Sequence, residues 1–177
     1  MAIATNALPY GLRDVKLAPL DSTDTPGTKV DLPASQTFSF SETEEVTELR
    51  GDDVLIAVKG KGAKVEWDLE AGGISLAAYV VMSGGTYSLT GVTPNQVRKL
   101  AKSGTDARPY FFVEGQAISD SGGDWHARVF KCKVTDNLEG EMKDGEFWIS
   151  KASGQGLPNQ TNQLYELVQN ETATAIT

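Results

Sequence analysis

The chain has 177 residues, of which 40% are hydrophobic, and a formal net charge of −8 at neutral pH. These values predict one folded domain with a sizeable core, and the acidic balance argues against a protein that grips nucleic-acid phosphates. No apolar run approaches the roughly 18 residues of a membrane span, and no signal peptide is expected. The single cysteine, Cys132, excludes an intrachain disulfide and fits a reducing compartment.

The N-terminal third begins with residues 1–10, which we interpret as an arm. Alternation from Leu12 to Leu17 predicts a short strand. Residues 19–35 are rich in Asp, Ser, Thr, Pro and Gly and predict an exposed loop. We assign residues 1–152, with this arm and loop, to one β domain and residues 153–177 to a linker and C-terminal arm. The last eight residues, NETATAIT, are expected to form a loose tail.

Residues 36–69 contain three strand-like runs, separated by turn signals at 51–53 and 59–62. In the last run, the apolar residues Ala63, Val65, Trp67 and Leu69 alternate with charged ones, which predicts a half-buried strand. The first run, 41–47, has no apolar face, and a monomer gains little from such a strand. It therefore indicates either pairing with other chains or the lining of a wet channel. A solvated edge hairpin is the alternative.

The middle of the chain predicts one helix and a second, shorter one. Residues 74–83 follow Gly72-Gly73, can be capped by Ser75 and stop at Gly84-Gly85, although a buried strand remains an alternative. A short strand is expected at 87–89. The second helix is predicted after Thr93, because Pro94 suits a first helical position and VRKLAKSG continues the pattern.

The last part predicts further strands at 109–118, 125–135, 146–151 and 164–168. Phe130, Cys132 and Val134 are expected on one face of the second of these, and DSGGD at 120–124 is a turn. Because the strands do not alternate with helices, a parallel doubly wound sheet is disfavoured. The predicted fold is mainly β, an antiparallel sandwich or partial barrel with one packed helix and possibly a second short helix.

No catalytic or metal-binding set emerges from the sequence. His126 is the only histidine, and the nearby Ser121 and Asp124 are explained by the turn. One His and one Cys do not make a transition-metal site, and Asp120 and Asp124 lack the EF-hand spacing. We therefore expect no enzyme activity, no cofactor and no metal, and we expect His126 to be dispensable.

Five segments, in this order, resemble the major tail tube proteins of long-tailed, non-contractile (siphovirus-type) bacteriophages. No single motif is diagnostic, but the ordered set covers the chain from about residue 8 onward. The segments are YGLRDVKL (10–17), KVEWDLEAGG (64–73) with the following ISLAAYVVMSGG, DARPYFFVEGQA (106–117), HARVFKCKVTDNLEGEM (126–142) and FWISKASG (147–154).

The resemblance implies a structural virion protein assembled in the bacterial cytoplasm. Subunits would form hexameric rings around a continuous inner β-barrel, and the rings would stack into a tube through which DNA passes without specific binding. The implied partners are further copies of the chain, a tape-measure protein and tail terminator or initiator proteins. The alternatives are the tube protein of a contractile injection or type VI secretion system, and a soluble ligand-binding β-sandwich.

On this interpretation, acidic residues of one strand parity are the candidates for lining the lumen, namely Glu42, Glu44 and Glu48. Residues at a hairpin tip are the candidates for contacting a basic patch on the adjacent ring. These tip residues are Asp52 and Asp53, and the basic candidates are Lys99, Lys102 and Arg108. Lys131 and Lys133 are alternative wall residues, and the loop 21–33 and the tail 154–177 are further inter-ring candidates. A solvated surface charge is the simpler explanation in each case.

Overall fold

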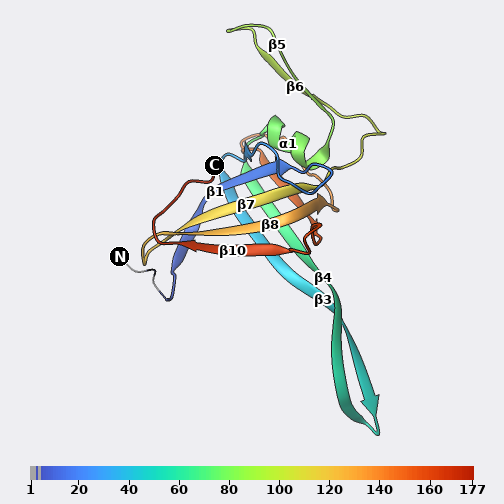
Figure 1. The fold of residues 1–177 in the computed structure, drawn as a ribbon. Coiled ribbons are helices and arrows are strands. Elements are labelled where there is room, and N and C mark those ends of the chain that lie inside the picture. The colour runs from blue at the N-terminus through green and yellow to red at the C-terminus, as the bar shows by residue number, and fades with distance from the viewer. Residues whose placement is uncertain (1–2, 4) are drawn as a thin grey trace.

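The computed structural model describes residue 3 and residues 5–177, so residues 1, 2 and 4 of the expected N-terminal arm lie outside it. The described chain contains ten strands and one helix (Figure 1). They are β1 (Pro9–Pro19), β2 (Val30–Asp31), β3 (Ser35–Gly51), β4 (Val54–Gly72), α1 (Leu76–Ser83), β5 (Thr86–Thr90), β6 (Val97–Ala101), β7 (Phe111–Ser119), β8 (Asp124–Val134), β9 (Ile149–Gly156) and β10 (Tyr165–Asn170).

The main sheet is antiparallel and runs in the order β2-β1-β7-β8-β9-β4-β3, with β10 paired to β8. It folds over so that β3 and β4 face β1, β7, β8 and β10. The Trp67 and Phe111 rings meet edge-on across the two layers, with centroids 5.4 Å apart. Gly115 lets the layers approach, because a Cβ there would lie 2.4 Å from the Phe38 ring. The predicted β-rich antiparallel fold is therefore confirmed.

The core lies between these layers and follows the alternation of the strands. Val65, Trp67 and Leu69 of β4 are buried as predicted, and they pack with Val15 and Leu17 of β1. Their charged neighbours in the chain, such as Glu66 and Asp68, are exposed. Period-two alternation with one apolar face is thus enough to orient β4.

Residues 76–83 form the predicted helix rather than a strand. The Ser75 hydroxyl accepts a hydrogen bond from the Ala78 amide at 3.3 Å, and Gly84 ends the helix with φ of 75°. The buried residues Ala78, Val81 and Met82 join the core cluster. The helix therefore packs against one end of the sandwich through a small apolar face (Figure 1).

The predicted second helix is wrong. Residues 97–101 form β6, which pairs antiparallel with β5 in a separate two-stranded hairpin. The local signals at Thr93 and Pro94 fall in the connection between the two strands instead. A helix there would have gained little from packing, since Val97 is exposed even in the observed structure, whereas the hairpin pairs backbone groups along both strands.

The turn predicted at 59–62 is also wrong, whereas the turn at 51–53 is confirmed. Asp52 and Asp53 take left-handed backbone angles between β3 and β4, which are 17 and 19 residues long. Lys59 to Gly62 stays within β4. Gly62, with φ of 75°, lies where the pairing shifts register, so its glycine accommodates a bulge inside a continuous strand.

Three smaller expectations need correction. Phe130 lies on the opposite face of β8 from Cys132, against Phe112, because the register of β7 and β8 shifts between Val113 and Phe111. The strand expected at 146–151 begins at Ile149 and continues to Gly156, past the division placed at residue 152. The tail is not loose, since Ile176 is only 3% exposed; its contacts are described below.

Candidate functional site: two projecting arms and a buried charge cluster

Residues 43–64 of β3 and β4 form a two-stranded ribbon that leaves the sandwich, here called the long arm (Figure 1). The pairing of β4 with β9 stops at Val65, and β3 is the end strand of the sheet. Among the described strands, those of the long arm therefore pair only with each other. Isolated two-stranded ribbons are marginally stable in water, so this shape favours a partner.

The two faces of the long arm carry opposite charges. Register places Glu44 and Glu48 on the face that continues the core side of the sandwich, with Glu42 at its base. The other face carries Lys59, Lys61 and Lys64, opposite Thr47, Glu45 and Thr43 respectively. Arg50 offsets part of the acidic face, because its guanidinium donates to Glu48 at 2.7 and 2.9 Å.

The structure brings the three lumen candidates to one face, as strand parity predicted, and puts Glu45 on the other. Glu42 accepts a hydrogen bond from the Tyr165 hydroxyl at 3.0 Å, and this bond raises the pKa of Tyr165. Glu44 lies over Gly60, where a Cβ would collide with its carboxylate. The lining of a channel by these residues stays a prediction.

The tip of the long arm combines charge with apolar side chains. Asp52 and Asp53 form the turn and are exposed. Leu49, Val54 and Ile56 beside them are also exposed. Association at this tip would be favourable, because it would bury exposed apolar side chains and the open strand edges can accept further strands.

The β5–β6 hairpin, residues 86–101, is here called the short arm. The sequence has no acidic residue between Glu70 and Asp106, and the short arm carries the exposed cations Arg98 and Lys99. Leu89 and Val97 are exposed as well. The short arm and the tip of the long arm project from opposite ends of the sandwich (Figure 1).

Of the three predicted basic contacts, only Lys99 lies on the short arm. Lys102 is next to it, and its ammonium donates to the Ser83 carbonyl at the end of α1. Arg108 donates to the carbonyls of Val134 and Asp136, at 3.1 and 2.5 Å. The sequence reasoning missed Arg98, although its position beside Lys99 in an acid-free segment was a usable signal.

The alternative wall residues Lys131 and Lys133 both lie over the Tyr110 ring, with their ammonium groups 5.1 and 4.9 Å from its centroid. Lys131 also pairs with Asp24 at 2.8 Å. Lys131 therefore fastens the loop after β1 to the sandwich. In the same loop, hydrogen bonds from Thr23 and Thr25 lower the pKa of Asp21.

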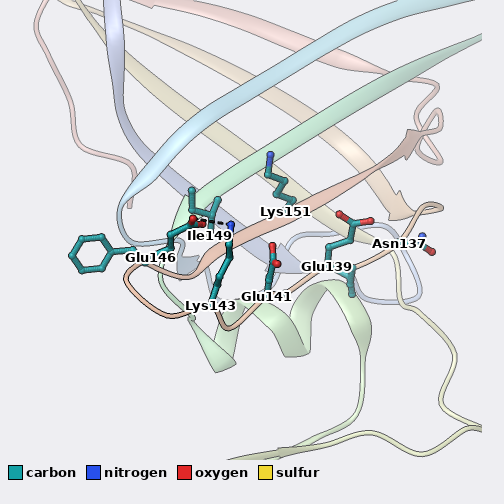
Figure 2. Close-up of a pocket in the computed structure, with 10 residues that line it drawn as sticks. Asn137, Glu139, Glu141, Lys143, Glu146, Ile149 and Lys151 are labelled. Atoms are coloured by element: carbon teal, nitrogen blue, oxygen red, sulfur yellow. Dashed lines mark ion pairs between the residues drawn. The ribbon is translucent and has the colours of Figure 1, made fainter.

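A hollow of about 620 Å³ lies between the loop before β9 and β9 itself (Figure 2). Glu139, Glu141 and Lys151 line it, and Lys143 pairs with Glu146 at 2.8 Å. Neighbouring Phe147 is 98% exposed. The lining contains no Ser, Thr, Cys or His side chain. Among residues 3 and 5–177, no group of three or more His, Cys, Asp or Glu side chains is placed to hold a metal ion.

A buried charge cluster on β7 and β8 was missed by the sequence reasoning. The His126 imidazole lies between two carboxylates, with Nδ1 2.8 Å from Glu114 and Nε2 2.9 Å from Asp124. Lys29 and Arg128 each contact Glu114 at 2.8 Å. Removing a residue so placed should cost stability, because it would leave two buried carboxylates without their shared partner. The expectation that His126 is dispensable for assembly stays a prediction.

No protein-family model matches the chain, and a search of curated proteins finds no significant relative. In the part of the chain that the structure describes, every helix is too short or too polar to cross a membrane. The two arms and the resemblance of the five sequence segments therefore carry the proposal that follows.

Proposed function

We propose that the chain is a tail tube subunit of a long-tailed, non-contractile bacteriophage. Copies form hexameric rings that stack into a tube, and DNA passes through the tube during ejection. The observation that carries the proposal is the pair of arms. The acidic, apolar tip of the long arm and the basic, apolar short arm project from opposite ends of one sandwich.

Such an arrangement supports head-to-tail association. A contact between two different surfaces of the same chain does not pair copies into a closed dimer but continues from copy to copy. Asp52 and Asp53 of one subunit would meet Arg98 and Lys99 of the next, and the exposed apolar side chains of both arms would be buried. Opposite charges fix the register and direction of such a contact more than they add affinity.

The acidic face of the long arm supplies the proposed lumen. Copies of Glu42, Glu44 and Glu48 around a ring would repel DNA phosphates, so that DNA slides without binding. Salt screens this repulsion beyond about 8 Å, so it would act close to the wall. The lysine face would then contact neighbouring subunits within the assembly. A tape-measure protein would occupy the lumen until ejection, and terminator and initiator proteins would close the ends.

Electron microscopy of the purified, concentrated chain tests this proposal. We expect stacked rings with an open central channel. Asp52→Lys with Asp53→Lys should abolish stacking, and so should Arg98→Glu with Lys99→Glu. Mixing the two variants should restore contacts between unlike copies. Asp120→Lys, an exposed acid in the β7–β8 turn, is the matched control and should stack normally.

Three outcomes would contradict the proposal. Wild-type chains that remain discrete at every concentration and keep an ordered long arm would favour a soluble binding protein. Tip variants that stack as well as the wild type would show that the two arms do not make the stacking contact. Rings that stack only inside a contractile sheath would instead indicate the tube protein of a contractile injection system.

A further inference from the structure

The cluster around His126 lies on the face of the β1-β7-β8-β10 layer that points away from the core. Gln116 pairs with His126 in register, and Glu114 pairs with Arg128, while the alternate residues Val113 and Val129 face the core. An outward face of a sheet is usually wet. Here, however, Glu114, Asp124 and His126 are only 1%, 0% and 3% exposed.

The C-terminal residues 171–177, here called the strap, cover this face. The strap runs from the end of β10 back toward β1 (Figure 1). The Thr174 amide donates to Asp124 Oδ2 at 2.8 Å, and Gln116 Nε2 donates to the Thr174 carbonyl at 3.0 Å. Lys16 donates to the carbonyl of Ile176, whose side chain is buried. Asp124 therefore joins the strap to the cluster.

The hydrogen-bond geometry determines the protonation state of His126. Ionised carboxylates only accept hydrogen bonds, and each ring nitrogen lies within 2.9 Å of one. Both nitrogens must therefore donate, so the ring is an imidazolium. The charges of the cluster then balance, because Lys29, His126 and Arg128 offset three carboxylates. The carboxylates are those of Glu114, Asp124 and Glu166, the last of which pairs with Arg128 at 2.9 Å.

We propose that His126 is a proton-operated latch for the strap. The imidazolium holds Glu114 and Asp124 in the positions that dock residues 171–177. When it loses its proton, a nitrogen lone pair faces a carboxylate oxygen, and the cluster carries an unbalanced buried negative charge. Asp124 then withdraws from the ring, and the Thr174 amide loses its acceptor. This inference does not depend on the proposed tube function.

The pKa shifts give the direction of the latch. Burial lowers the pKa of His126, but its hydrogen bonds with Glu114 and Asp124 outweigh burial and raise that pKa above 6.5. Stability from the imidazolium is thus present below pH 6.5 and is lost as pH rises through the raised value. Burial raises the pKa of each carboxyl, but its hydrogen-bond donors outweigh this and lower it to about 2. The strap is therefore held below pH 6.5 and is released as pH rises through the raised pKa of His126.

Other titratable groups lie around the latch and on the core face of β8. Burial raises the pKa of the Cys132 thiol, which lies on the core face of β8. The charged groups that face the cluster come from five strands, the loop before β2 and the strap. They are Asp14 and Lys16 of β1, Lys29 before β2, Asp31 of β2, Glu114 of β7, Asp124 and Arg128 of β8, Glu166 of β10, and Glu171 of the strap.

The test uses the fact that the chain has one histidine. Nuclear magnetic resonance of the full chain from pH 5 to 10 would follow the imidazole Cε1–H signal and the Thr174 amide. We expect the imidazole to titrate above pH 6.5 and the Thr174 amide to shift with the same midpoint. An imidazole that titrates at or below pH 6.5, or an amide that does not follow it, would overturn the latch.

His126→Gln separates the latch from general alkaline loosening, because glutamine donates hydrogen bonds but does not titrate. In this variant the Thr174 amide should show no transition between pH 6 and 10. A transition like that of the wild type would overturn the proposal. Asp120→Asn is the matched surface control and should keep the wild-type transition. If His126→Gln does not fold, the two wild-type titrations decide the question alone.

Discussion

The inner and outer halves of the β3–β4 ribbon use the same backbone pairing in different surroundings. In the inner half, Trp67 and Leu69 pack against a second layer, and β9 pairs with the open edge of β4. In the outer half, residues 43–64 have only each other and expose valines, leucines and glutamates alike. Strand pairing alone therefore gives a ribbon of marginal stability, whereas packing against a second layer gives a stable domain.

The largest effect should come from breaking the inner half. Trp67→Ala removes a fully buried side chain that contacts the Phe111 ring, and it should cost about 3–5 kcal/mol of unfolding free energy. Urea denaturation measures this value. Val58→Ala, on the same strand but in the long arm, is the matched control and should change the free energy by less than about 0.5 kcal/mol. Equal losses would erase the distinction between the halves.

The charge cluster should come next. Glu114→Ala leaves the buried His126 and the partly buried Lys29 without their shared partner, so we expect a loss of about 3 kcal/mol. Wild-type stability should also fall as pH drops from 4 toward 2. The pKa values of Glu114 and Asp124 are lowered to about 2 in the folded chain, so the stabilisation from their ionised forms is lost as they take up protons in this range. Glu141→Ala, an exposed acid in the loop before β9, is the control. Acid denaturation curves that coincide for the wild type and Glu114→Ala would contradict this account.

Shortening the outer half should affect assembly far more than folding. Replacing residues 46–60 by an Asn-Gly turn leaves Glu45 and Lys61 as the flanking pair, as in the observed register, and should keep the sandwich within about 1 kcal/mol of the wild type. It should also eliminate ring stacking in electron micrographs. A shortened chain that fails to fold would show that the arm stabilises the sandwich, contrary to the comparison.

The smallest effect on stability should come from the acidic face. Glu42→Lys, Glu44→Lys and Glu48→Lys together should change the unfolding free energy by less than about 1 kcal/mol, since these side chains are exposed. Assembled particles carrying them should nevertheless deliver DNA poorly. Glu45→Lys, on the opposite face, should deliver DNA normally. Normal delivery by the triple variant would remove the electrostatic role of the face.

Features set by neighbouring residues could be predicted from the sequence. The alternation of apolar residues predicted the orientation of Trp67. The Ser75 cap and Gly84 predicted the two ends of α1, and strand parity predicted a shared face for the three lumen candidates of β3. Each depends on contacts within one element or on the fixed period of a strand. Such features do not depend on how the rest of the chain folds.

Features set by distant partners could not be predicted. Residues 97–101 carry helix signals but pair with β5, and the bulge at Gly62 depends on the register with β3. The charge cluster requires the register of β7 with β8, and its burial requires a strap some 50 residues away from Asp124. The polar composition of the tail therefore indicated disorder, although the tail binds a polar face of the sheet.

Hydrogen exchange of the free and assembled chain tests the central comparison most directly. In dilute solution, amides of residues 43–64 should exchange rapidly, whereas amides of β7 and β8 should be protected. On assembly, protection should rise in the long arm and short arm and stay constant in β7 and β8. A long arm that is already protected in the dilute, discrete chain would contradict the account, because its strands would then need no partner.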